Sequence, residues 1–204
     1  RAQRPRTTPL AAWWLALSMG LSACASPPGA TPAGASSAQP AAASMVPLDT
    51  TLRAQTQAEA PAYLRTLETL VGIESGSRDL EGLQKLAGVL ADRLRAAGLQ
   101  VELKPTRAPD FHPQLKGAPL GPMVYGTKAG TGTRRVLLIA HMDTVYPRGM
   151  GAKQPFRIDG DRAYGLGIAD DKQGVALVLH AVELLARRGD TDYAQLGVLF
   201  NADE

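Results

Sequence analysis

The side chains best suited to chemistry lie in three short clusters far apart in the sequence. The clusters contain His141 with Asp143, Asp170 with Asp171, and, at the end of the chain, Glu204. An imidazole and several carboxylates are the ligand set of a hydrolytic zinc site. His141 offers a ring nitrogen to a metal, and Asp143 can accept the N–H of the other nitrogen. Asp170 has two oxygens that could bridge two cations, and a glutamate outside the ligand set could take a proton from water activated by the metal.

Taken singly, each cluster also has an ordinary structural interpretation. A His-x-Asp pair is common in polar loops, and two aspartates before a helix cap it and interact favourably with its dipole. Asp203 with Glu204 at a strand end is typical of a solvated turn. Because all three clusters stand directly after or before regular elements, their joint occurrence favours a shared site.

The predicted elements explain how the clusters would meet. Residues 136–140 form a continuous apolar run, typical of a central strand covered on both faces, and residues 197–200 form a second buried strand. The first and third clusters follow these strands, and the second opens an amphipathic helix over 172–188 that ends at Gly189. In open α/β sheets, ligands bind beyond the carboxyl ends of the strands. We therefore expect the clusters to converge at that edge.

The rest of the sequence also alternates between helical and strand patterns. The spacing of apolar residues predicts further helices and strands, and a Pro- and Gly-rich stretch predicts a loop. The helices are expected at 64–71 and 80–94, the strands at 99–103 and 124–128, the loop at 105–122, and a hairpin at 156–164 around Asp159 and Gly160. This alternation predicts an α/β layered sheet.

The N-terminal part has the layout of a secretory signal over residues 1–23. A basic start is followed by an uncharged, mostly apolar run that is shorter than the ~20 residues of a membrane span. Residues 21–24 (LSAC) resemble the lipobox of bacterial lipoproteins, in which Cys24 becomes the lipidated N-terminus. Ala25 after it favours anchoring in the outer membrane, facing the periplasm or the exterior. The alternative is an ordinary signal, and hence a periplasmic or secreted protein.

Composition predicts a tether and a neutral domain behind this signal. Residues 24–48 carry no charge and are rich in Ala, Pro and Ser, which predicts a flexible tether before a folded domain at 49–204. The chain has 22 basic and 19 acidic side chains, and Arg1, Arg4 and Arg6 account for the net charge of +3. The neutral domain gives no electrostatic reason to expect a nucleic-acid partner. A single cysteine excludes an internal disulfide and a multi-cysteine metal site.

Several other polar residues are assigned no role in the site. The glycine-rich stretch before Asp170 resembles a dinucleotide-binding loop, but this aspartate replaces the third glycine and would repel a pyrophosphate. His180 is expected to be a packed or half-exposed helix residue, and His112 a loop residue. Glu183 and Arg187 are expected to pair along one helix face.

Three stretches resemble the dizinc metallopeptidases of the aminoacylase/carboxypeptidase family. They are residues 140–146 (AHMDTVY), 164–172 (YGLGIADDK) and 199–204 (LFNADE). The intervals between them also match, and the resemblance extends over about residues 60–204. Within the family, the nearest likeness is to bacterial glutamate carboxypeptidases of the folate-hydrolysing type. The resemblance implies an α/β fold with a mixed, mostly parallel sheet, helices on both faces, and a separate lid or dimerisation domain.

The resemblance also implies roles for individual residues. Two zinc ions would be bound, with His141 as a ligand of one and Asp170 bridging both. The catalytic residues would be Asp143, which orients His141, and Glu204, the general base. The peptide bond from Asp170 to Asp171 would be cis. The implied substrate is a peptide or N-acyl amino acid, with C-terminal glutamate favoured, and the implied assembly is a lipid-anchored homodimer formed through the second domain.

The chain departs from the family pattern at its end. The pattern continues with a zinc-binding glutamate directly after Glu204, and the sequence stops before it. The later ligands, the second domain and the basic residues that grip the substrate carboxylate also lie beyond it, so we expect an N-terminal part of a longer protein. Two other functions stay open: an aminoacylase, deacetylase or dipeptidase on the same scaffold, and a non-catalytic surface lipoprotein that binds a metal or ligand. Cobalt or manganese would suit similar ligands.

Overall fold

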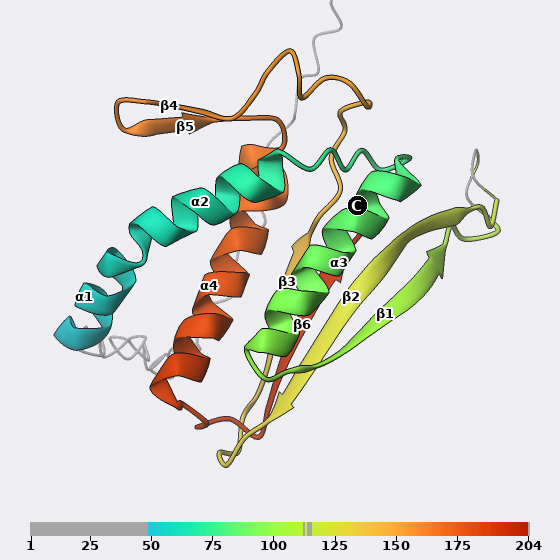
Figure 1. Ribbon diagram of the computed structural model, residues 1–204. Helices are drawn as coiled ribbons and strands as arrows, with labels where there is room; N and C mark the ends of the chain where they lie inside the picture. Colours follow the sequence, from blue (N-terminus) through green and yellow to red (C-terminus); the bar gives the residue numbers. More distant parts are fainter. Residues whose placement is uncertain (1–48, 112, 114–115, 204) are drawn as a thin grey trace, which may run out of the picture. The chain divides into compact units, whose positions relative to one another are not determined.

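The computed structural model describes residues 49–111, 113 and 116–203 (Figure 1). These residues belong to one compact unit of the chain, Pro47–Glu204. Several predictions fall outside the described residues: the signal segment 1–23, the lipidation site Cys24, the tether 24–48, His112 and Glu204. In the part that is described, no helix combines the length and the apolar character needed to cross a membrane.

A four-stranded sheet forms the base of this unit. Its strands are β1 (Gln100–Arg107), β2 (Pro119–Ala129), β3 (Arg135–His141) and β6 (Gln195–Asn201), in the order β1-β2-β6-β3. β2 pairs antiparallel with both β1 and β6, whereas β3 and β6 are parallel. β3 and β6 therefore end at the same edge of the sheet, where His141 lies opposite Asn201.

Helices and a small hairpin accompany the sheet in the described residues. They are α1 (Thr50–Ala58), α2 (Ala60–Val71), α3 (Leu80–Ala96), the short π-helical turn η1 (Ile168–Lys172), α4 (Gln173–Arg188), and the hairpin of β4 (Arg157–Asp159) and β5 (Arg162–Tyr164). α3 and α4 lie on one face of the sheet, and α2 packs against α4 (Figure 1). The hairpin forms around Asp159 and Gly160, as predicted.

Helix α3 shows how the sequence specifies these elements. Asp79 caps its start by accepting the backbone N–H of Gly82 at 3.0 Å, which satisfies a donor that the helix leaves unpaired. Four leucines recur with the helical period on the buried side: Leu83, Leu86, Leu90 and Leu94. The helix ends before Gly98, whose φ of 85° is costly for residues with a Cβ atom.

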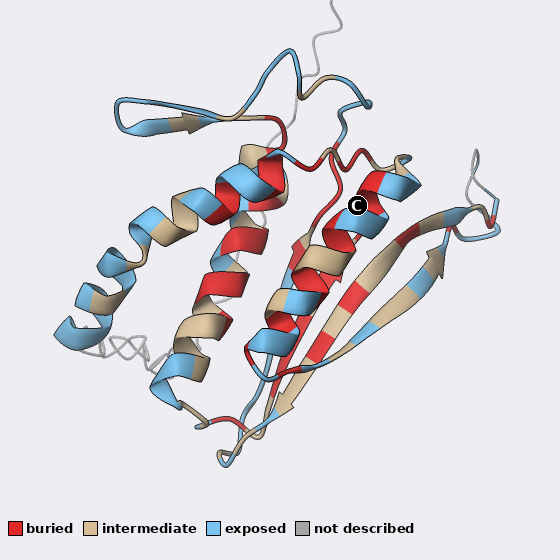
Figure 2. Ribbon diagram, in the orientation of Figure 1, coloured by how far each residue is buried: buried red, intermediate tan, exposed pale blue. Residues whose placement is uncertain are grey.

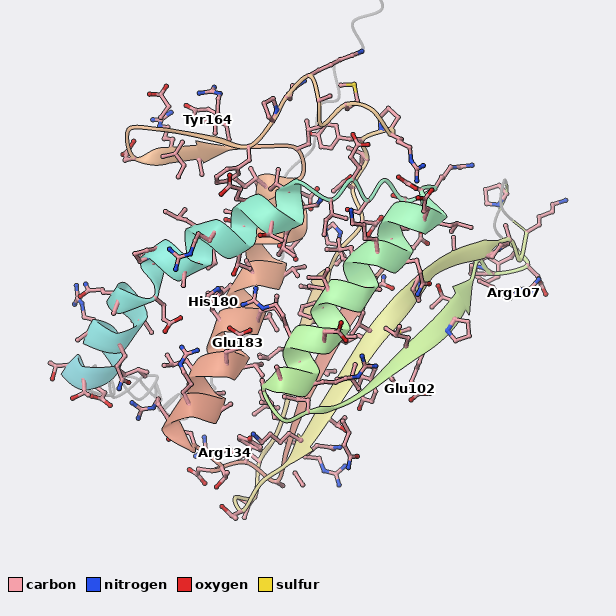
Figure 3. All side chains as sticks on the ribbon, viewed as in Figure 1. Glu102, Arg107, Arg134, Tyr164, His180 and Glu183 are labelled. Atoms are coloured by element: carbon pink, nitrogen blue, oxygen red, sulfur yellow. The ribbon has the colours of Figure 1, made fainter. Side chains whose placement is uncertain are left out.

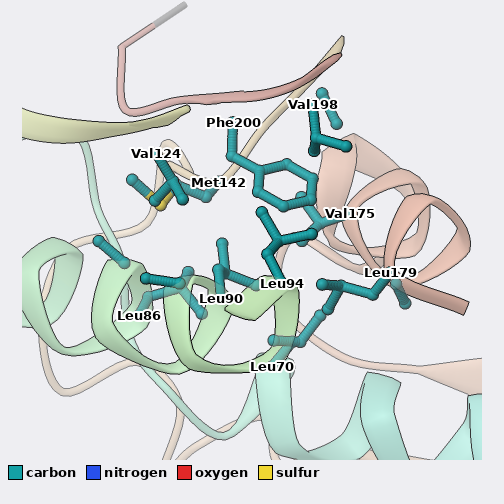
Figure 4. Packing of buried hydrophobic residues seen from close by; sticks show 14 of the residues in the cluster. Leu70, Leu86, Leu90, Leu94, Val124, Met142, Val175, Leu179, Val198 and Phe200 are labelled. Carbon is teal, nitrogen blue, oxygen red and sulfur yellow. The ribbon is translucent and has the colours of Figure 1, made fainter. Parts of the chain in front are cut away.

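The hydrophobic core lies between the sheet and the helices (Figures 2 and 4). Helices and strands both contribute fully buried side chains to it: Leu70, Leu86, Leu90, Leu94, Val124, Val175, Leu179, Val198 and Phe200. Burying one such side chain contributes roughly 1.5–3 kcal/mol. The core therefore holds the ends of β3 and β6 firmly relative to the helices beside them.

The expected fold class is confirmed, because the unit layers helices on a mixed sheet. Among the described strands, one of the three pairings in the larger sheet is parallel. On the face away from α3 and α4, Leu137 and Ile139 of β3 are 53% and 63% exposed. The burial predicted for both faces of the 136–140 run is therefore wrong for the described part of the chain, where the described helices cover the opposite face.

Strands replace both ends of the loop predicted at 105–122, and residues 108–118 lie between the strands. β1 continues to Arg107, and β2 begins at Pro119. The pairing register between β1 and β2 shifts around Pro105. Proline has no N–H to donate to the ladder and is tolerated at bulges and on outer strands. In this sequence the proline marks such an irregularity and does not end the strand.

Candidate functional site

Two of the three predicted clusters meet at the carboxyl edge of the sheet. His141 is the last residue of β3, and Asp170 lies in η1, which leads into α4. The Nε2 atom of His141 and the Oδ1 atom of Asp170 are 2.9 Å apart. The predicted convergence is therefore observed for these two clusters. Asp203 of the third cluster is described at the end of β6, whereas Glu204 lies outside the described residues.

The imidazole of His141 lies between two carboxylates. Its Nδ1 atom is 3.2 Å from Oδ1 of Asp143, and its Nε2 atom faces Asp170. A neutral imidazole carries one N–H and can donate to only one of these carboxylates. When Asp143 accepts that N–H, the lone pair of Nε2 faces the Asp170 oxygen, and a bound cation satisfies both atoms.

The residue between His141 and Asp143 anchors them to the core. The side chain of Met142 is fully buried among the hydrophobic residues (Figure 4), and its N–H donates to the Asn201 carbonyl at 2.8 Å. Side chains alternate along an extended backbone, so the two flanking residues lie on the side away from the core. Asp143 is only 3% exposed, whereas the side chain of Asp170 is 75% exposed. A ligand can therefore reach Asp170 directly, while Asp143 stays behind the ring.

Two adjoining cavities give access to this edge. The first, of about 320 Å³, is lined by His141, Asp143 and Asp170. The second, of about 530 Å³, shares Ser77 and Tyr146 with it as walls. The site is therefore open to a ligand larger than an ion. Ser77 has no place among the clusters predicted from the sequence.

The donor atoms fit a zinc ion in kind. An imidazole nitrogen and a carboxylate oxygen are both common zinc ligands, and here they meet at one point. Catalytic zinc sites usually have three protein ligands. No group of three or more His, Cys, Asp or Glu side chains that could hold a metal occurs among the described residues. Among the described residues, His141 and Asp170 could therefore supply only part of such a ligand set. The peptide bond between Asp170 and Asp171 is cis, as the resemblance implied.

Lys172 is a further residue of this region that the sequence analysis missed. Its buried ammonium group donates to the carbonyl oxygens of Leu70 at 2.7 Å and Ile73 at 2.5 Å, at the end of α2. Burial lowers the pKa of Lys172 to about 8, against a smaller opposing effect of Glu74. The C-terminal end of a helix dipole favours a cation. The bonds tie η1, which carries Asp170, to α2 across 102 positions of sequence, a distance at which no local pattern reveals them.

A second imidazole cluster lies between the helices. The Nδ1 atom of His180 is 3.1 Å from Oε2 of Glu59, and its Nε2 atom is 2.8 Å from the hydroxyl of Thr66. Carboxylate, imidazole and hydroxyl follow one another as in a nucleophilic triad. However, Thr66 is buried and accepts a hydrogen bond from Arg93 at 2.8 Å. His180 is thus a packed helix residue, as predicted.

The predicted pair of Glu183 and Arg187 is wrong. Glu183 accepts two hydrogen bonds from Arg93 of α3, at 2.8 and 2.9 Å, and Arg187 donates to Glu59. Figure 3 shows His180 and Glu183 on the same helix, α4. Packing brings Arg93 within reach of Glu183 and Glu59 within reach of Arg187. These contacts take the place of the predicted pair along α4.

Comparison with known proteins links this geometry to a family. The profile described as peptidase family M20/M25/M40 matches residues 137–204, which include His141 and Asp170. Over 146 residues, the sequence is 44% identical to Carboxypeptidase G2 of Pseudomonas sp. (strain RS-16). That alignment covers 72% of this chain and 33% of the relative.

Solved structures share the fold. Human carnosine dipeptidase 1 matches with a TM-score of 0.62 at 18% identity, over 75% of this chain and 34% of that one. The M20 family metallo-carboxypeptidase Sso-CP2 from Sulfolobus solfataricus matches with a TM-score of 0.54 at 21% identity, over 69% of this chain and 30% of that one. The chain spans about a third of the length of these relatives. Residues 137–204 therefore carry a domain of the peptidase family M20/M25/M40.

Proposed function

We propose that the complete protein is a zinc-dependent exopeptidase, specifically a carboxypeptidase. Its substrate is a peptide or N-acyl amino acid, with C-terminal glutamate favoured. The observation that carries the proposal is the meeting of His141 Nε2 and Asp170 Oδ1 at 2.9 Å beside an open cavity. The 44% identity to Carboxypeptidase G2 supports the same activity. The preference for glutamate rests on the resemblance of the sequence motifs.

In this proposal, His141 and Asp170 would be among the residues that hold zinc. Peptidases of this family are zinc-dependent in general. Zinc polarises a scissile carbonyl and lowers the pKa of bound water. Asp143 accepts the Nδ1 hydrogen of His141 and so presents Nε2 as the ligand atom. Its burial restricts it to this orienting role.

Glu204 is the general base in this proposal. Its carboxylate takes a proton from the attacking water and returns it to the nitrogen of the leaving amine. The C–N bond of the amide breaks as the new C–O bond forms, so the products are a carboxylic acid and a free amine.

Replacing Glu204 tests this role in the complete protein. Glu204→Gln is expected to keep bound zinc, measured by elemental analysis, and to lose peptide hydrolysis. Glu102→Gln is the matched control, because Glu102 lies on β1 with a side chain that is 67% exposed. Undiminished turnover of Glu204→Gln would refute the assignment of the base.

A substrate panel tests the proposed specificity. Peptides with free C-termini are expected to be hydrolysed, and their C-terminal amides to resist, with glutamate preferred at the last position. Preference for acylated amino acids or for dipeptides would instead indicate an aminoacylase, deacetylase or dipeptidase. Zinc binding without hydrolysis of any member would indicate a non-catalytic binding protein.

We also propose that the protein is a homodimer anchored to the outer membrane through a lipid on Cys24. The support for the anchor is the position of the single cysteine at the end of the predicted signal segment. The dimer rests only on the resemblance of the sequence motifs. Metabolic labelling with palmitate should mark the wild-type protein and leave Cys24→Ser unlabelled. Labelling of neither protein would contradict the anchor, and light scattering at the mass of a monomer would contradict the dimer.

A further inference from the structure

The carboxylate of Asp143 is held from both sides. Its Oδ1 atom faces His141, and its Oδ2 atom accepts a hydrogen bond from the hydroxyl of Ser77 at 2.7 Å. Asp143 is 3% exposed, so solvent has little access to its oxygens. Hydroxyl, carboxylate and imidazole thus form one chain of hydrogen bonds that ends at the Nε2 atom of His141.

The main chain fixes Ser77 relative to Asp143. Ser77 belongs to residues 72–79, here called the connecting segment, which joins α2 to α3 and is largely buried where it passes the end of β3 (Figure 2). The N–H of Ser77 donates to the Thr144 carbonyl at 3.0 Å, and the N–H of Thr144 donates to the Ser75 carbonyl at 2.8 Å. The connecting segment therefore joins residues 142–144 through a single parallel β-bridge between Gly76 and Thr144.

Close approach of the two backbones also restricts the sequence. A Cβ atom at Gly76 would collide with the carbonyl oxygen of Tyr146. Glycine is the residue that permits such contact between backbones. The main chain at Ser77 is therefore held close to the loop after β3. The Ser77 hydroxyl has the Thr144 carbonyl as a second, longer acceptor at 3.2 Å, and the Asp143 carboxylate is the nearer one.

Side chains reinforce the same junction. The Glu74 carboxylate accepts the backbone N–H groups of Gly149 and Gly151 at 2.7–2.9 Å, and these bonds lower the pKa of Glu74. Arg148 donates to Asp79 and Glu81. The loop after β3 is thus bound to the connecting segment on either side of Ser77.

We propose that Ser77 is a positioning residue that orients Asp143 and, through it, His141. The inference rests on the proposed zinc-peptidase function. When the hydroxyl occupies Oδ2, Oδ1 is directed toward Nδ1 of His141, and the Nε2 atom is presented to the metal. Without the hydroxyl, the carboxylate can rotate and the ring loses its fixed tautomer.

Zinc affinity of the complete protein measures this effect. Removal of a group that orients a metal-binding histidine typically costs 10–100-fold in affinity, and we expect about 10-fold for Ser77→Ala. Ser77→Thr keeps the hydroxyl and should restore most of the affinity. Ser75→Ala is the matched control, because Ser75 is buried in the same segment but donates to the Met142 carbonyl at 2.8 Å. This control should lower the melting temperature and leave the zinc affinity within about twofold.

A double-mutant cycle separates positioning from a general loss of structure. If Ser77 acts through Asp143, Ser77→Ala should cause no further loss of zinc affinity in Asp143→Asn. Additive losses would overturn the proposal, and so would a Ser77→Ala variant that binds zinc as the wild type does.

A metal-free measurement distinguishes this proposal from the proposed function. Ring nitrogen shifts of ¹⁵N-labelled histidine at one fixed pH report the His141 tautomer, which Ser77→Ala should convert to a mixture. Unchanged His141 shifts would overturn the role of Ser77 even if zinc binds. A wild-type protein that binds no zinc would refute the proposed function, and the ring shifts would still decide the role of Ser77.

Discussion

The His141 and His180 clusters use the same side-chain types for different purposes. In both, the Nδ1 atom lies near a carboxylate oxygen, at 3.2 Å from Asp143 and 3.1 Å from Glu59. The partners of Nε2 differ: Asp170 faces His141, whereas the hydroxyl of Thr66 faces His180. A hydroxyl can donate as well as accept, but an ionised carboxylate can only accept. The His180 network therefore closes within the protein, whereas the His141 pair favours a cation.

Position in the fold reinforces this difference. His141 stands where β3 ends, beside a cavity and an exposed carboxylate. His180 packs between helices, where Tyr63 lies edge-on against its ring at 5.7 Å between centroids. A cavity of about 310 Å³ also reaches His180, but both of its ring nitrogens have partners within the helical layer. The contrast between the two histidines therefore rests on the partner of Nε2, which is a carboxylate at His141 and a hydroxyl at His180. The following predictions test this distinction in the complete protein.

The largest effect is expected from removing the ring at the sheet edge. His141→Ala should lower kcat/KM by ~10³-fold or more, because a metal supplies several kcal/mol of stabilisation to the transition state. The same variant should lose the rise in melting temperature that zinc gives the wild type, a rise that reflects preferential binding to the folded state. Activity and zinc-dependent stabilisation that survive in His141→Ala would place the metal elsewhere.

Removing the ring in the helical layer should affect stability alone. His180→Ala leaves Glu59 and Thr66 without their shared partner, which should cost about 2 kcal/mol of folding free energy. Activity per folded molecule and zinc affinity should match the wild type. Thermal unfolding and steady-state kinetics on the same preparation give both values. A large loss of kcat with unchanged stability would assign His180 to catalysis and remove the contrast between the clusters.

The ion pair beside His180 should contribute less. Glu183→Gln weakens the two bonds from Arg93, whose side chain is 27% exposed, and we expect a loss of about 1 kcal/mol. Asp92→Asn is the control, since Asp92 pairs with Arg95 at the surface with a side chain that is 80% exposed. Exposed pairs of that kind contribute little. Equal shifts in melting temperature for the two variants would show that burial of the Arg93 pair has no effect.

The smallest expected effect is a pH dependence of the folding free energy. The hydrogen bond with His180 lowers the pKa of Glu59 below its ordinary value of 4.5, aided by Arg187 and opposed by burial. Because the folded state then binds fewer protons than the unfolded state, this stabilisation is complete above the ordinary pKa and is lost as pH falls through the lowered one. Glu59→Gln should therefore lose less stability than the wild type between about pH 5 and pH 3. The measurement is the melting temperature of both proteins as a function of pH. Equal losses for Glu59→Gln and the wild type across that range would contradict the role of Glu59.

Local patterns in the sequence predicted elements where a short-range rule applies. The leucines of α3 follow the helical period, and Gly98 and Gly189 end α3 and α4 with positive φ angles. The strand before His141 and the strand before Asn201 were also predicted, and so was their common edge. The exposure of one side of β3 was not predicted, because an apolar run alone does not show which faces of a strand other elements cover.

The residue types of the candidate site, the elements that carry them and the meeting of His141 with Asp170 could all be predicted from local sequence patterns. The side chains that support that site could be identified only from the folded unit. Ser77 donates to Asp143 across 66 positions of sequence, and Lys172 donates to Leu70 across 102. Arg93 of α3 pairs with Glu183 in place of Arg187, which lies on the same helix as Glu183. Hydrogen bonds require donors and acceptors within about 3 Å, and at such separations packing of the whole unit sets the distance.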